Sequence, residues 1–236
     1  MENIEKAVKE LLHANDGHGF DHVERVRSLA MLFAEKEEAN TRVVELASLL
    51  HDVDDYKIFG QESAENLTNA TQILNANGID AETSQSVLRI IRTMGYNKYL
   101  EGVRPGSIEG RIVSDADMCE SLGAIGILRT HAYALSKGND FFDKSLAPED
   151  QQLSAEEYRA SKKSHSAQHF FDKLLKIPSM LLTESGKFEG KKRRAIMVEF
   201  LKELFVEEDA QDWLTHLEVF EAKHLGGFPA KIDRPD

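Results

Sequence analysis

The hydrophobic positions of this chain recur every three or four residues, which is the spacing of one face of an α-helix. Val23, Val26, Ala30 and Phe33 mark such a face in a helix expected over residues 21–38. Similar faces follow one another almost to the C-terminus. No segment shows the alternation of Val, Ile and Thr with polar residues that predicts a strand. We therefore expect an all-α protein, a compact bundle of many helices.

The other expected helices are separated by Gly, Asn, Asp and Pro residues, which favour turns and helix ends. Asp80 is the expected N-cap of one helix, and Pro178 is expected to end another. Residues 96–107 and 137–153 are polar and are expected to form loops. The expected helices are a segment that ends near residue 52, then 61–77, 80–94, 108–136, 154–176, 179–208 and 210–224.

Composition restricts the class of protein. A chain of 236 residues with 41% hydrophobic content can bury a large core, and we expect one domain over residues 1–236. The single cysteine, Cys119, excludes an internal disulfide framework. No leader-like apolar segment and no membrane span is visible, so a cytoplasmic location is expected. The net charge of −12 argues against general nucleic-acid binding, because a phosphate backbone needs clustered cations.

The most informative chemistry is the doublet His51-Asp52, which follows the apolar residues 46–50. An imidazole nitrogen beside a carboxylate oxygen suits a divalent transition metal. A buried carboxylate without a partner would be costly, and a metal ion supplies that partner. His22 and Asp117 complete a candidate set of two imidazoles and two carboxylates. An octahedral ion would keep two positions for water and substrate, which suits metal-assisted hydrolysis.

These residues stand in a pattern that resembles the HD-domain superfamily of metal-dependent phosphohydrolases. The superfamily pattern is carried by His22, by the doublet His51-Asp52 and by Asp117. Three further blocks resemble a subgroup of small, single-domain bacterial HD hydrolases. They are HDVDDYK at residues 51–57 for "HDxxDxK", residues 115–129 for "DADxLDAxGAxGIxR", and residues 169–175 for "HFxxKLL".

The chain departs from the family pattern at three places, one of which is His131-Ala132, where an aromatic residue often follows the arginine. Gly19 and Asp21 stand in the block that the family usually writes "HDxxH", and Glu120 stands where the family has the second Asp of "DxLD". Asp115 points about 200° away from Asp117 on a helix, so one ion cannot easily bind both. The resemblance selects Asp117 as the ligand and leaves Asp115 a structural role.

The resemblance implies one divalent ion per chain, held by His22, His51, Asp52 and Asp117. Its identity stays open among Mn, Mg, Fe, Co, Ni and Zn. No histidine occurs between His51 and His131. Because two-metal HD proteins need histidines in this interval, the sequence disfavours a dinuclear oxygenase or a cyclic-dinucleotide phosphodiesterase.

Asp55 is the candidate catalytic residue that is not a ligand. It lies three residues after Asp52 and four after His51, so on a continued helix it would face the same side as both. Two roles stay open: a carboxylate that orients the His51 ring, or a general base that accepts a proton from the attacking water. The candidate substrate-binding residues are cations and a histidine that can contact phosphate oxygens, with surface or structural pairing as the alternative: Arg25, Lys57, His169 and Lys173.

The expected function is metal-dependent hydrolysis of a nucleotide or another small phosphate ester. The alternative is a metal-dependent nucleotide-binding or regulatory protein with little turnover. We expect helices within residues 18–120 to build the metal site and helices within 154–224 to cover the pocket. No nucleic-acid or membrane partner is expected, and the oligomeric state stays open.

Overall fold

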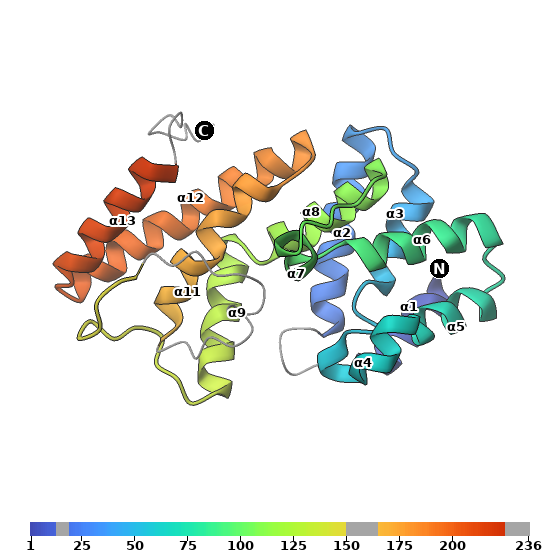
Figure 1. Cartoon of the computed structure of the whole chain (residues 1–236), viewed down its shortest axis with the longest axis horizontal. Coiled ribbons are helices and arrows are strands. Elements are labelled where there is room, and N and C mark those ends of the chain that lie inside the picture. Colours follow the sequence, from blue (N-terminus) through green and yellow to red (C-terminus); the bar gives the residue numbers. More distant parts are fainter. Residues whose placement is uncertain (13–18, 150–164, 225–236) are drawn as a thin grey trace.

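The structure, a computed structural model, describes residues 1–12, 19–149 and 165–224, which are mostly helical and contain no strand. This confirms the all-α prediction (Figure 1). The elements are α1 (Glu2–Leu11), α2 (Phe20–Lys36), α3 (Thr41–Leu50), α4 (Tyr56–Asn66), α5 (Thr68–Ala76), α6 (Ala81–Thr93), α7 (Tyr96–Leu100), α8 (Ile108–Glu120), α9 (Gly123–Ser136), α11 (Ser166–Asp172), the 3₁₀ helix η1 (Leu174–Met180), α12 (Glu184–Glu207) and α13 (Gln211–His224).

Two long helices expected from the pattern are each broken in two. The segment 61–77 is divided between α4 and α5 at Leu67, whose φ is +50°. Its buried side chain and the capping of α5 by Asp54, which accepts from Asn69 N and Ala70 N at 2.9 Å, offset the cost of a left-handed residue. Periodicity cannot reveal such a break, because the apolar face resumes after it.

The segment 108–136 is divided between α8 and α9 at Gly123, whose φ is +75°. Glycine adopts this conformation without strain. A Cβ at Gly123 would also lie 3.3 Å from Arg193 Cβ on α12, so the glycine allows close packing between the two elements. The break turns α9 away from α8 and toward the C-terminal helices.

Of the other predicted helix ends and loops, some are confirmed and others are wrong. Asp80 is the N-cap of α6, and its side chain accepts from Thr83 N at 2.9 Å. The expected loop 96–107 begins with the short helix α7. Pro178 does not end an α-helix as predicted: α11 already ends at Asp172, and Pro178 lies inside η1. The expected start of that helix, residues 154–164, lies outside the described residues.

The helices form two groups with α8 between them. In Figure 1, α9, α11, α12 and α13 lie on one side of α8, and α1 to α6 lie on the other. Helix α2 packs against both α3 and α8, and α12 packs against α8, α9 and α13. A continuous set of buried apolar side chains runs from Ile4 in α1 to Phe220 in α13. None of the described helices combines the length and the apolar character that crossing a membrane requires.

A buried carboxylate fastens the C-terminal group to α8. Asp115 is fully buried and accepts from Leu182 N, Thr183 N and Thr183 Oγ1 at 2.7–3.0 Å. Gly186 allows this contact, since a Cβ there would lie 2.3 Å from Asp115 Oδ2. Burial raises the pKa of Asp115, although the hydrogen bonds from Thr183 and Leu182 oppose the rise. Asp115 therefore has the structural role that the sequence predicts.

Asp115→Ala should lower the free energy of unfolding by about 1–3 kcal/mol for each buried donor that it leaves without a partner. Urea-induced unfolding followed by circular dichroism measures this change. Glu184→Ala is the control, because it removes an exposed carboxylate of the same segment that pairs with the exposed Lys187, and should have a much smaller effect. Equal effects of the two substitutions would contradict the anchoring role of Asp115.

Candidate metal centre

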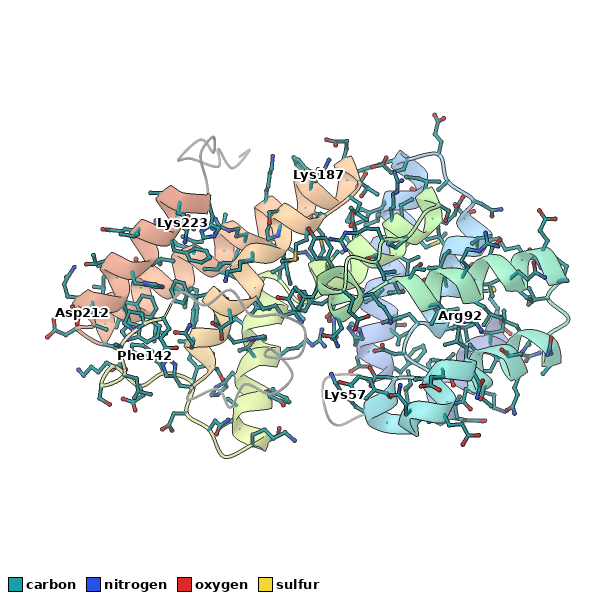
Figure 2. The ribbon with its side chains drawn as sticks, in the orientation of Figure 1. Lys57, Arg92, Phe142, Lys187, Asp212 and Lys223 are labelled. Atoms are coloured by element: carbon teal, nitrogen blue, oxygen red, sulfur yellow. The ribbon has the colours of Figure 1, made fainter. Side chains whose placement is uncertain are left out.

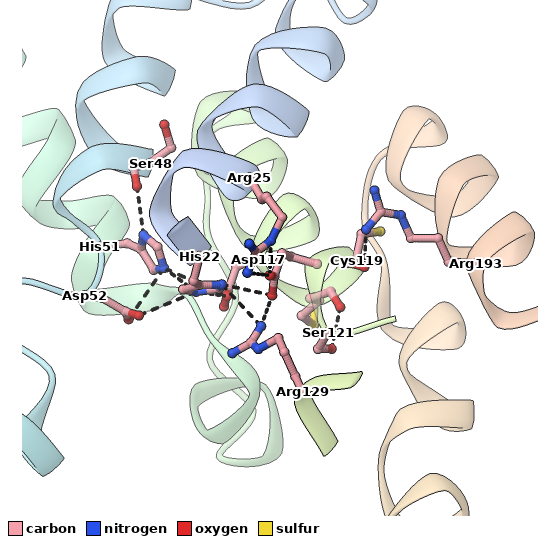
Figure 3. A network of polar contacts seen from close by, with 12 residues as sticks. His22, Arg25, Ser48, His51, Asp52, Asp117, Cys119, Ser121, Arg129 and Arg193 are labelled. Atoms are coloured by element: carbon pink, nitrogen blue, oxygen red, sulfur yellow. Dashed lines mark hydrogen bonds and ion pairs between the residues drawn. The ribbon is translucent and has the colours of Figure 1, made fainter. Parts of the chain in front are cut away.

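Three helices bring the four predicted ligands to one point. His22 lies in the first turn of α2, His51 and Asp52 follow the last residue of α3, and Asp117 lies in the last turn of α8. Because α2 packs against α3 and α8, the four side chains converge where these helices meet (Figure 3).

The ligand atoms lie within a few ångströms of one another. His22 Nε2 and His51 Nε2 are 3.2 Å apart. Asp52 lies 3.5 Å from each of these nitrogens, through Oδ2 to His22 and Oδ1 to His51. Asp117 Oδ1 is 3.5 Å from His22 Nε2 and 3.9 Å from His51 Nε2. Two nitrogens and two carboxylates around one point form a donor set that suits a divalent ion such as Mn, Fe, Co, Ni or Zn.

The surroundings of the two rings favour the tautomers that metal binding requires. His51 Nδ1 lies 2.8 Å from the Ser48 carbonyl oxygen, which can only accept, so Nδ1 carries the hydrogen and Nε2 offers a lone pair. His22 Nδ1 lies 2.9 Å from Glu120 Oε2 and 3.2 Å from Arg129 Nη1. The closer carboxylate oxygen favours a hydrogen on Nδ1, which leaves His22 Nε2 free to bind an ion.

Electrostatics keeps Asp117 available as a ligand. Burial acts to raise the pKa of Asp117, but the neighbouring His22 and His51 outweigh it, and the pKa is lowered. The carboxylate is therefore ionised near neutral pH.

Glu120 is the residue at this site whose importance the sequence did not reveal. Its side chain is 1% exposed, and its Oε1 accepts from Arg25 Nε at 2.9 Å and lies 2.9 Å from Arg25 Nη2. Its Oε2 lies against His22 and forms an ion pair with Arg129. A signal was present, since Glu120 follows Asp117 by three positions and shares its face of α8. Two arginines on one carboxylate leave a positive charge beside the ligands.

Asp55 does not lie on a continuation of α3, because that helix ends at Leu50. It is instead the N-cap of α4, and its Oδ1 accepts from Lys57 N at 2.8 Å. The idea that Asp55 orients the His51 ring is wrong, since the Ser48 carbonyl makes that contact.

A cavity of about 520 Å³ opens beside the ligands. His51, Asp52, Asp117 and Asp55 are among the residues that line it. Residues of α4, α6 and α7 complete its wall.

Positive charge also lies near the site, on residues that do not line this cavity. The positive residues are Arg129 on α9 and Lys173, which follows α11. The negative charge of Asp117 acts to raise the pKa of each. Burial lowers the pKa of Lys173 to about 8, with Asp117 opposing and Lys57 and Arg129 adding to the decrease. Lys57 lies at the end of α4 nearest the C-terminal helices in the view of Figure 2. In the part of the chain that the structure describes, the residues that line the cavity include none of these three cations.

The residues predicted to bind phosphate therefore do not all lie together. The charge of Lys57 contributes to the lowered pKa of Lys173. Arg25, whose side chain is 40% exposed, forms an ion pair with Glu120. The backbone oxygen of His169 accepts from Lys173 N at 3.0 Å, which places His169 one turn before that lysine. Lys173 Nζ also lies 4.5 Å from the centre of the Tyr96 ring.

Comparison with known proteins agrees with this geometry. Residues 19–122 match the family model of the HD domain. The chain is 30% identical over 195 residues to the uncharacterized protein YpgQ of Bacillus subtilis, covering 82% of this chain and 86% of YpgQ.

Solved structures share the fold over almost the whole chain. A protein from Lactobacillus plantarum has a TM-score of 0.75 at 32% identity, covering 89% of this chain and 96% of that one. An HD-superfamily hydrolase from Bacillus thuringiensis has a TM-score of 0.66 at 32% identity, covering 89% and 98%. YpgQ in complex with ADP has a TM-score of 0.64 at 27% identity, covering 87% and 96%. The chain belongs to the HD-domain superfamily, as its two histidines and two aspartates predicted.

Proposed function

We propose that this protein is a metal-dependent phosphohydrolase that acts on a nucleotide or another small phosphate ester. The observation that carries the proposal is the convergence of His22, His51, Asp52 and Asp117 at one point, with a cavity beside them and cations nearby. The relation to an HD-superfamily hydrolase supports the hydrolase class. The binding of ADP by the related YpgQ supports a nucleotide as substrate.

The residues of the site have separate proposed roles. His22, His51, Asp52 and Asp117 hold one divalent ion, which when bound would supply Lewis-acid activation of water and of a phosphoryl oxygen. Asp55, which lines the same cavity as Asp52 and Asp117, accepts a proton from the attacking water.

The cations complete the proposed site by holding the phosphate oxygens. Lys57, Lys173 and Arg129 stabilise the charge that develops on the phosphoryl group. Arg25 and His169 are the outer members of this set, because Arg25 is bound to Glu120 and His169 lies one turn before Lys173.

The metal site gives the first prediction. Elemental analysis of the purified protein should find about one divalent ion per chain, because the described residues contain one cluster of three or more closely spaced metal-binding side chains. Asp52→Ala should remove the ion. Glu65→Ala should retain it, since Glu65 lines the same cavity and does not belong to the cluster of metal-binding side chains. Two ions per chain, or an unchanged ion content in Asp52→Ala, would contradict the assignment.

The decisive experiment is a hydrolysis screen over nucleoside mono-, di- and triphosphates and simple phosphate esters with Mn, Mg, Co and Ni, on wild type and Asp55→Asn. The Asn variant should keep the fold and the ion, because an amide oxygen can still cap α4 and no ligand changes. It should lose about 10²–10⁴-fold in kcat, since an amide cannot accept the proton. Full activity in Asp55→Asn would remove Asp55 from the mechanism.

The same screen tests the alternative function. A wild-type protein that binds a nucleotide together with its metal and hydrolyses none of the compounds would be a metal-dependent binding or regulatory protein.

Lys173 gives a pH prediction. With a pKa of about 8, its ammonium is charged below that pH and neutral above it, so kcat/KM should fall as the pH rises through about 8. Lys173→Arg should flatten this decline, because a guanidinium keeps its charge. Lys173→Met should lower kcat/KM at neutral pH by about 10–100-fold. Lys187→Met, which removes an exposed lysine of α12, is the control and should leave the pH profile unchanged.

A further inference from the structure

The cavity beside the metal centre differs in chemistry from the cationic side of the same centre. Its volume of about 520 Å³ is within the range of sites that enclose a small organic ligand. His51, Asp52 and Asp117 line it, so a ligand that fills the cavity contacts candidate ligands of the metal site.

The wall of the cavity combines apolar surface with amides. Leu67, Ile91 and Met94 supply apolar surface, and Leu67 and Met94 are buried in the core. Gln61 and Asn97 supply amide groups that can both donate and accept. Flat heteroaromatic rings are recognised by this combination, with apolar contacts on the faces and hydrogen bonds at the edges.

The charges of the cavity oppose a phosphate chain inside it. Asp55, Glu65 and Glu101 line it together with Lys98 and Arg92. Lys98 is neutralised by an ion pair with Glu101 at 3.1 Å, which leaves Arg92 with Asp55 and Glu65, besides Asp54 and the candidate ligands Asp52 and Asp117. Phosphates are instead favoured beside Lys57, Arg129 and Lys173, which do not line the cavity.

We infer that the cavity between α4, α6 and α7 is the nucleoside subsite, which receives the base and sugar of the substrate while its phosphates extend toward Lys57, Arg129 and Lys173. This inference rests on the proposed function, since it assigns the two ends of the same substrate. The carboxylates of the cavity accept hydrogen bonds from sugar hydroxyls or from amino groups of the base. The division of charge thus fixes the direction in which the substrate binds.

The test compares two ligands that share a diphosphate and differ by adenosine, namely ADP and inorganic pyrophosphate. Their Kd values are measured by isothermal titration calorimetry on the Mn²⁺-loaded protein. Ala64 on α4 lines the cavity, so Ala64→Trp fills part of it. The substitution should raise the Kd of ADP by about tenfold or more through steric exclusion. The Kd of pyrophosphate should stay within about twofold, because the phosphate side is untouched.

Two further variants keep the test decisive. Glu62→Trp introduces the same side chain at an exposed position of α4 that does not line the cavity, and both Kd values should stay as in wild type. Asn97→Ala removes an amide without adding bulk, and should raise the Kd of ADP alone by about twofold to tenfold. This variant decides the question if Ala64→Trp fails to fold, which far-ultraviolet circular dichroism reports.

The possible outcomes separate this inference from the proposed function. Wild type that binds ADP no more tightly than pyrophosphate, or variants that weaken both ligands equally, would overturn the nucleoside subsite even if the enzyme hydrolyses nucleotides. Selective loss of ADP binding in Ala64→Trp and Asn97→Ala, in a protein that hydrolyses none of the compounds screened, would retain the subsite and overturn the hydrolase proposal.

Discussion

The arrangement of two imidazole nitrogens, 3.2 Å apart between two carboxylates, is the constraint on which the rest of the site depends. The lone pairs of the two nitrogens and the negative charges of the two carboxylates repel one another at such distances unless a proton or a cation lies among them. The packing of α2 against α3 and α8 has to hold these groups together. The fold therefore stabilises a local arrangement that a divalent ion would relieve, and most residues of α3 and α8 are buried.

Helix α8 links the candidate metal centre to the remainder of the molecule through three carboxylates, each with different contacts. Asp115 faces α12 and fastens its start, Asp117 faces the histidines, and Glu120 lies beneath His22 between Arg25 and Arg129. The helical repeat separates the first from the other two by direction. Because Arg129 comes from α9, the C-terminal helices are connected to the metal centre both through Asp115 and through Glu120. A shift of either contact would move the candidate ligand Asp117.

The sequence predicted the elements that have local signals and missed those set by tertiary contacts. Asp80 predicted the start of α6, and the spacing of apolar residues predicted α2 and α3. The left-handed Leu67 gave no signal, since its conformation depends on burial and on the carboxylate of Asp54 fifteen residues from Asn69 along the chain. Asp55 was expected on a continued helix, but α3 ends first. Which groups orient the histidine rings likewise depends on distant neighbours.

The unequal distribution of charge explains how a chain of net charge −12 can suit an anionic substrate. The excess of carboxylates extends to the cavity wall, where Glu65 and Glu101 lie, whereas Arg129, Lys57 and Lys173 gather near Asp117 outside that wall. Over such short distances, nearby charges outweigh the distant ones that solvent and salt screen. A phosphate group would thus be attracted by these cations and repelled by the carboxylates that line the cavity. The same contrast that makes phosphate binding possible also determines which end of the substrate enters the cavity.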